Sequence, residues 1–291
     1  MPVMGGLACR RQLVPGVRSR GMTSAVNQPA SSLAWPTLIR STAISGITGA
    51  LTGVLVGGIG GRIVMRISAL VAGESARGAI TDNGDRVGDF TIEGTLEVLA
   101  NGLIFGVVGS VVWILSEPWL QRYGRYVGLS FGILLFALAG TEAIVADNRD
   151  FAILDPAWLN VLLFGLLFFA YGLLFPVLRR LNDRMLPGQV NTTTAQNVLY
   201  GFVLVLGLLF VVITFAALFA DALCQTCGPS QRLPGIAFTG MAGATAVLRW
   251  KQLHDGPATD DRRLVTVGMV SLAATVVLGL IITIPEIADI I

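Results

Sequence analysis

Seven long apolar segments constrain this chain more than any other feature of its sequence. Each holds about 20 mostly apolar residues, the length that an α-helix needs to cross a hydrocarbon core about 30 Å thick. Across the chain 54% of residues are hydrophobic and 13% are charged, against roughly a quarter charged in soluble domains. The sequence therefore predicts an all-α, polytopic transmembrane helical bundle of about seven spans. The spans are approximately 38–61, 96–116, 126–146, 157–178, 197–220, 234–250 and 264–285.

The sixth segment, 234–250, is the weakest of the seven predicted spans. It is short, rich in glycine, and carries Thr239 and Thr245. If it does not cross the membrane, the count falls to six and the C-terminus changes side. Residues 37–291 are expected to form a single transmembrane domain.

Residues 1–36 are expected to form a basic, disordered N-terminal tail. Four arginines and no acidic residue occur in it, a composition that fits an organellar transit peptide. It fits equally well a start codon placed too early, with Met22 opening the chain, or a plain cytoplasmic tail. The arginines are Arg10, Arg11, Arg18 and Arg20.

Loop charge predicts the orientation of the bundle. Lys and Arg are retained on the cytoplasmic side during insertion. With the N-terminus inside, most of the 20 basic residues fall in cytoplasmic segments and most of the 18 acidic residues fall on the opposite side. The five tryptophans lie at or near predicted span ends, where indole rings favour the interface. We therefore expect a cytoplasmic N-terminus and an extracytoplasmic C-terminus.

An internal repeat relates the first two spans to the third and fourth. Residues 82–92 and 147–153 share the pattern Asp-Asn, Arg and Asp-Phe ahead of the second and fourth spans. Duplicated units of this kind occur in transporter folds. The pattern predicts that spans 1–2 and 3–4 form parallel hairpin repeats, with chance similarity between apolar helices as the alternative. Further matches are Phe105-Gly106 with Phe164-Gly165 and Pro118 with Pro176.

Residues 147–160, with the sequence DNRDFAILDPAWLN, carry a family resemblance. The stretch resembles a pattern in uncharacterised multi-pass integral membrane proteins of GC-rich, actinobacteria-like bacteria. The resemblance covers about the first 180 residues and brings no assigned activity and no catalytic residues. It implies a plasma (inner) membrane location. A mitochondrial membrane is the alternative that the Arg-rich N-terminus suggests.

A glycine stripe runs along the first span. Small residues at every fourth position let another helix backbone come close in lipid. The stripe predicts tight packing of the first span within the chain, or a homo-oligomer contact. The stripe residues are Gly49, Gly53, Gly57 and Gly61, and the candidate partners are Gly102 and Gly106 on the second span and Gly128 and Gly132 on the third.

Arg62 and Arg66 lie on one helix face beside the glycine stripe, at the outer membrane boundary. A guanidinium at that depth needs a partner or must reach the interface. The pair is a candidate anion site or gating ion pair. The alternative is a structural anchor for the acidic 74–97 loop.

Glu142 lies about one turn inside the outer end of the third span. A carboxylate within a membrane span is a candidate cation or proton site. Arg149 or Arg62 would neutralise it in a structural alternative.

Cys224 and Cys227 form the pair Cys-x-x-Cys at the outer end of the fifth span. Disulfides persist outside the cytoplasm, so the pair is a candidate disulfide. Thiol redox chemistry is the alternative, although membrane oxidoreductases need a second pair and Cys9 is expected on the other side.

Several function classes are excluded by what the sequence lacks. His254 is the single histidine, which removes bis-His haem ligation and His-rich metal sites. No basic stripe for nucleic acid and no Walker A motif occur. We expect no enzyme activity, no cofactor and no metal. Two main hypotheses remain: a small solute or ion transporter-like bundle, and a non-catalytic membrane scaffold or assembly partner. A membrane thiol-disulfide protein is a remote third. The expected partners are the lipid bilayer and a homo-oligomer or membrane complex.

Overall fold

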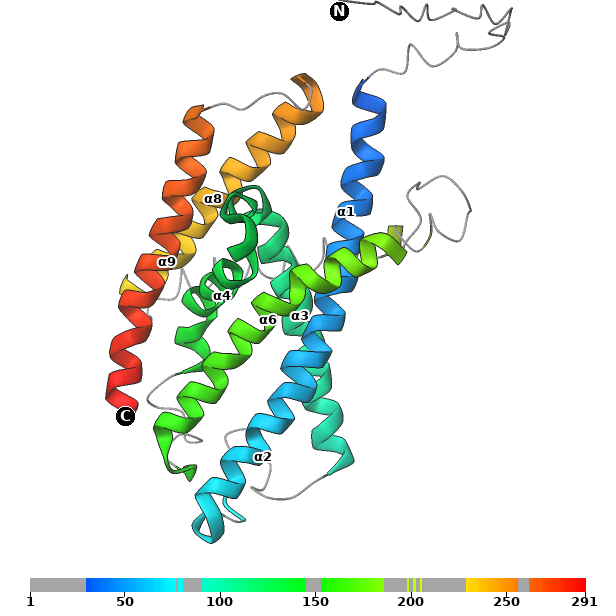
Figure 1. Ribbon diagram of the computed structural model, residues 1–291. Coiled ribbons are helices and arrows are strands. Elements are labelled where there is room, and N and C mark those ends of the chain that lie inside the picture. Colours follow the sequence, from blue (N-terminus) through cyan, green and yellow to red (C-terminus); the bar gives the residue numbers. More distant parts are fainter. Residues whose placement is uncertain are drawn as a thin grey trace, which may run out of the picture.

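A computed structural model shows the chain as a bundle of long helices (Figure 1). Every regular element in the part that it describes is a helix, which confirms the predicted all-α class. The described residues are 30–76, 78–80, 91–144, 153–185, 198, 201–202, 205, 229–255 and 262–291.

The first span belongs to one continuous helical rod. The rod consists of α1 (Ala30–Thr52), the π-helix η1 (Gly53–Gly60) and α2 (Gly61–Ala72). It ends at Gly73, whose φ of 72° is readily adopted only by glycine. Residues 30–36, predicted as part of the tail, are the first turns of α1.

The π-helix keeps the glycine stripe on one face of this rod. An α-helix turns about 100° per residue, so a stripe repeating every four residues drifts by about 40° at each step. A π-helix closes its hydrogen bonds from i to i+5 and turns less per residue. The segment Gly53–Gly60 therefore offsets the drift and holds the glycines toward the next helix.

That next helix is α3 (Ile92–Leu120), which packs on the glycine stripe. Its first turn is capped by Thr91, whose hydroxyl accepts a hydrogen bond from the Gly94 amide at 3.1 Å. A Cβ atom added to Gly53 would lie 2.2 Å from the Gly102 carbonyl oxygen. Gly49 and Gly106 approach one another similarly. The two helices therefore touch backbone to backbone, at the partner positions that the sequence suggested for the second span.

A turn at Gly124 separates α3 from α4 (Val127–Ala143). The turn is the 3-10 segment η3 (Gln121–Tyr126), and Gly124 has a φ of 55°. Residues 121–126 are all exposed. The apolar stretch from Ile92 to Gly140 therefore folds back on itself as two helices.

The second close-packed hairpin pairs α4 with α6 (Ala157–Met185). A Cβ atom on Gly172 would lie 2.3 Å from the Gly132 nitrogen and 2.7 Å from the Gly128 carbonyl oxygen. Gly128 and Gly132 were candidate partners for the first span, and that assignment is wrong. They face α6 because α4 turns back beside α6, while α3 already covers the glycine stripe.

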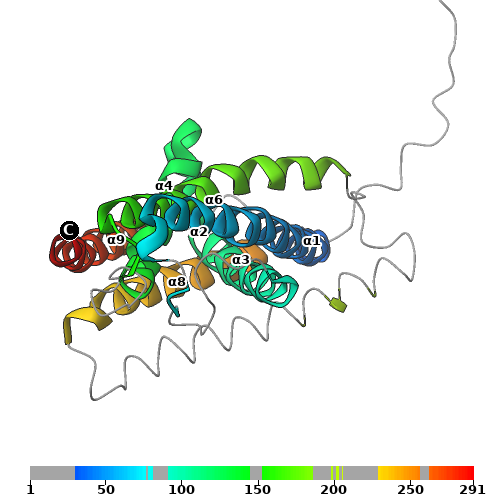
Figure 2. The same ribbon diagram turned by 90° about the horizontal axis from the view of Figure 1, so that it is seen from below.

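The last hairpin consists of α8 (Pro229–Asp255) and α9 (Arg262–Ile290). Gly279 brings α9 against α4, since a Cβ atom there would lie 2.1 Å from the Ala137 carbonyl oxygen. Seen from below, α6 and α8 lie on opposite sides of the bundle (Figure 2). The predicted fifth span, 197–220, lies largely outside the described residues. Only residues 198, 201, 202 and 205 of it are described, and all four are helical.

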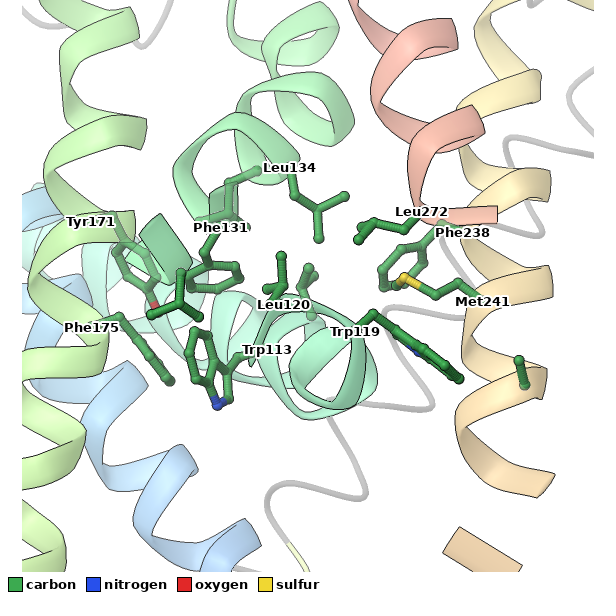
Figure 3. Packing of buried hydrophobic residues seen from close by; sticks show 14 of the residues in the cluster. Trp113, Trp119, Leu120, Phe131, Leu134, Tyr171, Phe175, Phe238, Met241 and Leu272 are labelled. Atoms are coloured by element: carbon green, nitrogen blue, oxygen red, sulfur yellow. The ribbon is translucent and has the colours of Figure 1, made fainter. Parts of the chain in front are cut away.

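Aromatic side chains fill the middle of the bundle (Figure 3). The ring of Trp113 lies with its centroid 5.0 Å from that of Phe131 and 4.9 Å from that of Phe175. These rings come from α3, α4 and α6, so one cluster holds both glycine-packed hairpins together. Trp119, Phe238, Met241 and Leu272 continue the cluster toward α8 and α9.

The outward faces carry apolar side chains. Leu51, Leu55, Ile59 and Ile63 are 45 to 55% exposed along the first rod, opposite the glycines. Four stretches are long and apolar enough to cross a membrane. They are Thr37–Ala72, Ile92–Gly140, Ala157–Met185 and Arg262–Ile290. The described helices thus fit a membrane protein, and α8, which holds the weak sixth segment, is not among the four.

Candidate functional site

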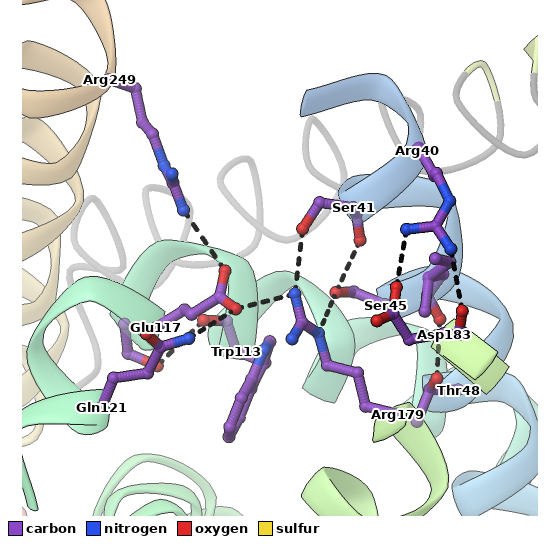
Figure 4. A network of polar contacts seen from close by, with 12 residues as sticks. Arg40, Ser41, Ser45, Thr48, Trp113, Glu117, Gln121, Arg179, Asp183 and Arg249 are labelled. Carbon is purple, nitrogen blue, oxygen red and sulfur yellow. Dashed lines mark hydrogen bonds and ion pairs between the residues drawn. The ribbon is translucent and has the colours of Figure 1, made fainter. Parts of the chain in front are cut away.

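A buried carboxylate on α3 organises the polar contacts at one end of the bundle (Figure 4). Glu117 follows Trp113 by four residues and precedes Leu120 by three, and this spacing puts all three on one helix face. Trp113 is 2% exposed and Leu120 is 1% exposed. The face that packs into the core therefore carries Glu117 with it.

Two arginines from different helices share this carboxylate. Arg179 of α6 donates from Nη2 to Oε1 of Glu117 at 2.7 Å, and Arg249 of α8 donates from Nη2 to Oε2 at 3.3 Å. Gln121 donates from Nε2 to Oε1 at 3.0 Å. The three charged groups carry a net charge of +1. They join α6 and α8 through Glu117 of α3.

Arg179 is also held by α1. Its Nε donates to the Ser45 hydroxyl at 3.2 Å and its Nη2 donates to the Ser41 hydroxyl at 2.9 Å. Its guanidinium carbon lies 5.9 Å from the centroid of the Trp113 ring. One arginine therefore ties three helices together, as the planar, multi-donor guanidinium permits.

The indole nitrogen of Trp113 lies beside this network and is unsatisfied. Its N–H is buried and has no acceptor among the residues that the structure describes. In Figure 4 the nitrogen lies on the edge of the ring that faces Arg179 and Glu117. A buried tryptophan N–H normally donates to an acceptor, so this N–H is available to bind one.

Hydroxyl groups along α1 complete the polar face toward α6. Ser45, Thr48 and Thr52 are fully buried, and each donates to the carbonyl four residues earlier. Their oxygens remain free to accept hydrogen bonds. Asn182 uses Thr48 in this way, at 2.9 Å.

A second ion pair lies at the rim of the network. Arg40 donates to the Asp183 carboxylate at 2.6 Å and to its backbone carbonyl at 2.9 Å. The Asp183 side chain is 57% exposed, whereas that of Glu117 is 7% exposed. Solvent screens the Arg40–Asp183 pair far more than the Glu117 contacts.

The sequence-predicted arginines lie at the other end of the first rod, in α2. Arg62 is half-buried, and its Nε and Nη2 atoms are buried without a hydrogen-bond partner in the described part of the chain. Arg66 is exposed. Neither arginine forms an ion pair with an acidic residue that the structure describes. The loop acids Asp82, Asp85 and Asp89 lie outside the described residues.

Two further predicted sites fall outside what the structure describes. Glu142 lies in the last turn of α4, and its side chain is not among the described groups. Cys224 and Cys227 lie wholly outside the described residues.

The network around Glu117 was not predicted from sequence. The second span was expected to end at 116, which left Glu117 in a loop, and Arg179 and Arg249 were counted only as cytoplasmic loop charges. One signal was present. Glu117 is the only acidic residue between Glu97 and Glu142, and it stands at a span end where basic residues dominate.

Within the described residues, no group of three His, Cys, Asp or Glu side chains is placed to hold a metal ion. The ring of His254 stacks on Trp250 with centroids 4.2 Å apart, near the end of α8. Comparisons of the chain with protein-family models, with curated proteins and with solved structures found no match.

Proposed function

We propose that the chain is a seven-span protein of a bacterial inner membrane that works as a small-solute transporter-like bundle. Its cytoplasmic end is held closed by the Glu117–Arg179–Arg249 contacts. The observation that supports this proposal is the burial of Glu117 between arginines of two helices that are distant in sequence. Ionisable groups buried in membrane bundles are costly and mark functional sites by default.

The direction of the helices supports the span count. Arg179 lies near the C-terminal end of α6 and Arg249 near that of α8, and both bond to Glu117. The two helices therefore run in the same direction, which supports the prediction of one further span, 197–220, between them. The stretch Ile92–Gly140 has 49 residues, and a straight helix of that length would be about 70 Å long, more than twice the hydrocarbon core. It counts as two spans, and α8 supplies another.

Charge supports the orientation. The end of the bundle that holds Glu117 also holds most of the described basic residues, which fits the cytoplasmic side. The described acidic residues at the opposite end fit the outside. The basic residues at the Glu117 end are Arg40, Arg122, Arg125, Arg179, Arg180, Arg184, Arg249, Lys251, Arg262 and Arg263. The described acidic residues at the other end are Glu74, Glu93, Glu97, Asp155, Glu286 and Asp289.

The gate follows from the energetics of a buried ion pair. Such pairs gain little net stability, because desolvation offsets most of the attraction. Their geometry nevertheless favours one arrangement of the helices that they join. A modest change at Glu117 can therefore shift the balance between a closed and an open cytoplasmic end.

A second proposal, a non-catalytic membrane scaffold, rests on a different observation. Trp113, Phe131, Tyr171 and Phe175 pack ring against ring across the middle of the bundle. A centre filled in this way favours a rigid body. The glycine stripe no longer supports a homo-oligomer contact, since α3 covers it.

Thiol labelling in inverted membrane vesicles separates the two proposals. Ser116 is fully buried beside Glu117 and bonds only to carbonyls of its own helix, so Ser116→Cys is a suitable probe in a chain whose native cysteines are serines. Glu117→Gln is expected to speed alkylation roughly tenfold, the effect of a shift of about 1.4 kcal/mol in the closed-to-open balance. Asp183→Asn, at the exposed pair, should leave the rate unchanged.

Ser68→Cys is the control for unfolding, because Ser68 is 2% exposed at the far end of the bundle. Its alkylation rate should not respond to Glu117→Gln. An unchanged rate at Ser116→Cys would rule out the gate and favour the scaffold.

A further inference from the structure

We infer that the Glu117 network is a binding site for an oxyanion, a carboxylate or phosphate group, held by Arg179, Arg249 and the Trp113 N–H in place of the Glu117 carboxylate. The inference names the ligand class of the proposed gate and in that respect rests on the proposed function, whereas the site itself is argued from its own contacts.

The charge count favours an anion. Arg179 and Arg249 bring two positive charges to the single negative charge of Glu117. Gln121 is neutral, and Arg40 and Asp183 balance one another. Among the described residues, one positive charge therefore remains uncompensated around a carboxylate that is 7% exposed, where water screens it poorly.

The hydrogen-bonding group left unpaired beside Glu117 in the described part of the chain is a donor, the N–H of Trp113. Glu117 already accepts from three side chains, on both of its oxygens. Trp113 has a buried N–H with no acceptor among the described residues. An oxyanion would supply the acceptor that the Trp113 indole nitrogen lacks among the described residues.

Glu117 itself shows the ligand chemistry that the arginines accept. Guanidinium groups bind carboxylate and phosphate oxygens with the same geometry. The Arg249 contact is the longer of the two, at 3.3 Å, and the Arg249 side chain is 34% exposed against 23% for Arg179. The α8 side is therefore where Glu117 would be displaced first, and Glu117 acts as an internal competitor.

If Glu117 competes with the ligand, loss of its carboxylate should strengthen anion binding. A purely structural network would not show this increase. The full chain is purified in neutral detergent, and its melting temperature is followed as sodium phosphate is raised at constant ionic strength with chloride. Ligand that binds the folded state raises the melting temperature in a saturable manner. Glu117→Gln should lower the half-saturating phosphate concentration roughly tenfold, because the competitor is gone. Arg179→Gln and Arg249→Gln should abolish the response, and Asp183→Asn should retain it.

The anion has two possible sources, which a second arm distinguishes. The same variants are titrated with phosphatidylglycerol in mixed micelles, since basic sites between spans on the cytoplasmic side also bind lipid headgroups. A response to phosphate identifies a soluble anion, and a response to phosphatidylglycerol alone identifies a lipid phosphate. Either result, with the expected order of variants, supports the site.

The inference is overturned if neither the wild-type chain nor Glu117→Gln responds to either probe, or if the arginine variants respond as the wild type does. Binding in detergent needs no gate movement. A chain that binds phosphate but fails the Ser116→Cys labelling test keeps the site and loses the gate, and the reverse result keeps the gate and loses the site.

Discussion

The contact between Gly53 of η1 and the α3 backbone allows a stability prediction to be worked out in detail. A Cβ atom on Gly53 would lie 2.2 Å from the Gly102 carbonyl oxygen and 2.5 Å from the Gly106 Cα atom, whereas ordinary contacts begin at 3.4 Å. Both neighbours are backbone atoms, so no side chain can rotate away. For Gly53→Ala the helices must separate by roughly 1 Å in a close-packed interior.

Overpacking of this kind costs about 1–3 kcal/mol. Alanine regains up to about 1 kcal/mol over glycine through helix propensity. Because the clash involves two backbone atoms, we place its cost at the upper end of the range, and Gly53→Ala should therefore destabilise the bundle by about 1–2 kcal/mol. The measurement is the midpoint of unfolding when sodium dodecyl sulfate is added to the protein in mild detergent, followed by tryptophan fluorescence.

Gly61→Ala is the matched control on the same stripe. A Cβ atom there would meet only Val98 Cγ1, at 3.7 Å, which is an ordinary contact. The variant should be as stable as the wild type or up to about 1 kcal/mol more stable. Equal midpoints for Gly53→Ala and Gly61→Ala would refute the close backbone contact between η1 and α3.

Two further predictions concern single polar contacts. Tyr171→Phe removes the hydrogen bond from the Tyr171 hydroxyl to the Gly106 carbonyl at 2.7 Å. That carbonyl keeps its hydrogen bond within α3, so the same unfolding titration should show a loss of about 0.5–1.5 kcal/mol. An unchanged midpoint would mean that the bond contributes nothing. Asp183→Asn removes an ion pair that is 57% exposed on the carboxylate side, and it should change stability by less than about 1 kcal/mol. A larger loss would show that Arg40 belongs to the buried network.

The sequence predicted the helices and one of their contacts because both depend on local pattern. Apolar length marks a helix that can cross a membrane, and the fourfold repeat from Gly49 to Gly61 marks a face that admits another backbone. The pattern does not name the partner. Gly102 and Gly106 were correctly suggested because sequential helices often pack together, whereas Gly128 and Gly132 face α6 after the chain turns at Gly124.

The candidate site was harder to predict because its members are charged residues near helix ends. Hydropathy places a span boundary at the first charge, so Glu117 fell one residue beyond the predicted span. Arg179 and Arg249 are 70 positions apart, and no local pattern shows that α6 and α8 both reach α3. Arg62 was predicted to need a partner, and its Nε and Nη2 atoms are buried without one among the described residues.

The π-helical segment η1 also limits which deletions the first helical rod can tolerate. In an ordinary α-helix, deletion of one residue rotates everything beyond it by about 100°. Deletion within Gly53–Gly60 would in addition draw the loosely wound turns toward α winding. Gly49 and Gly61 would then leave their common face, and Arg62 would be carried round the helix axis with α2. Replacement of Leu55 or Ile59, which are 45% and 46% exposed, changes only the outward surface. The number of residues between Gly49 and Gly61 is thus under tighter constraint than the identity of the apolar residues among them.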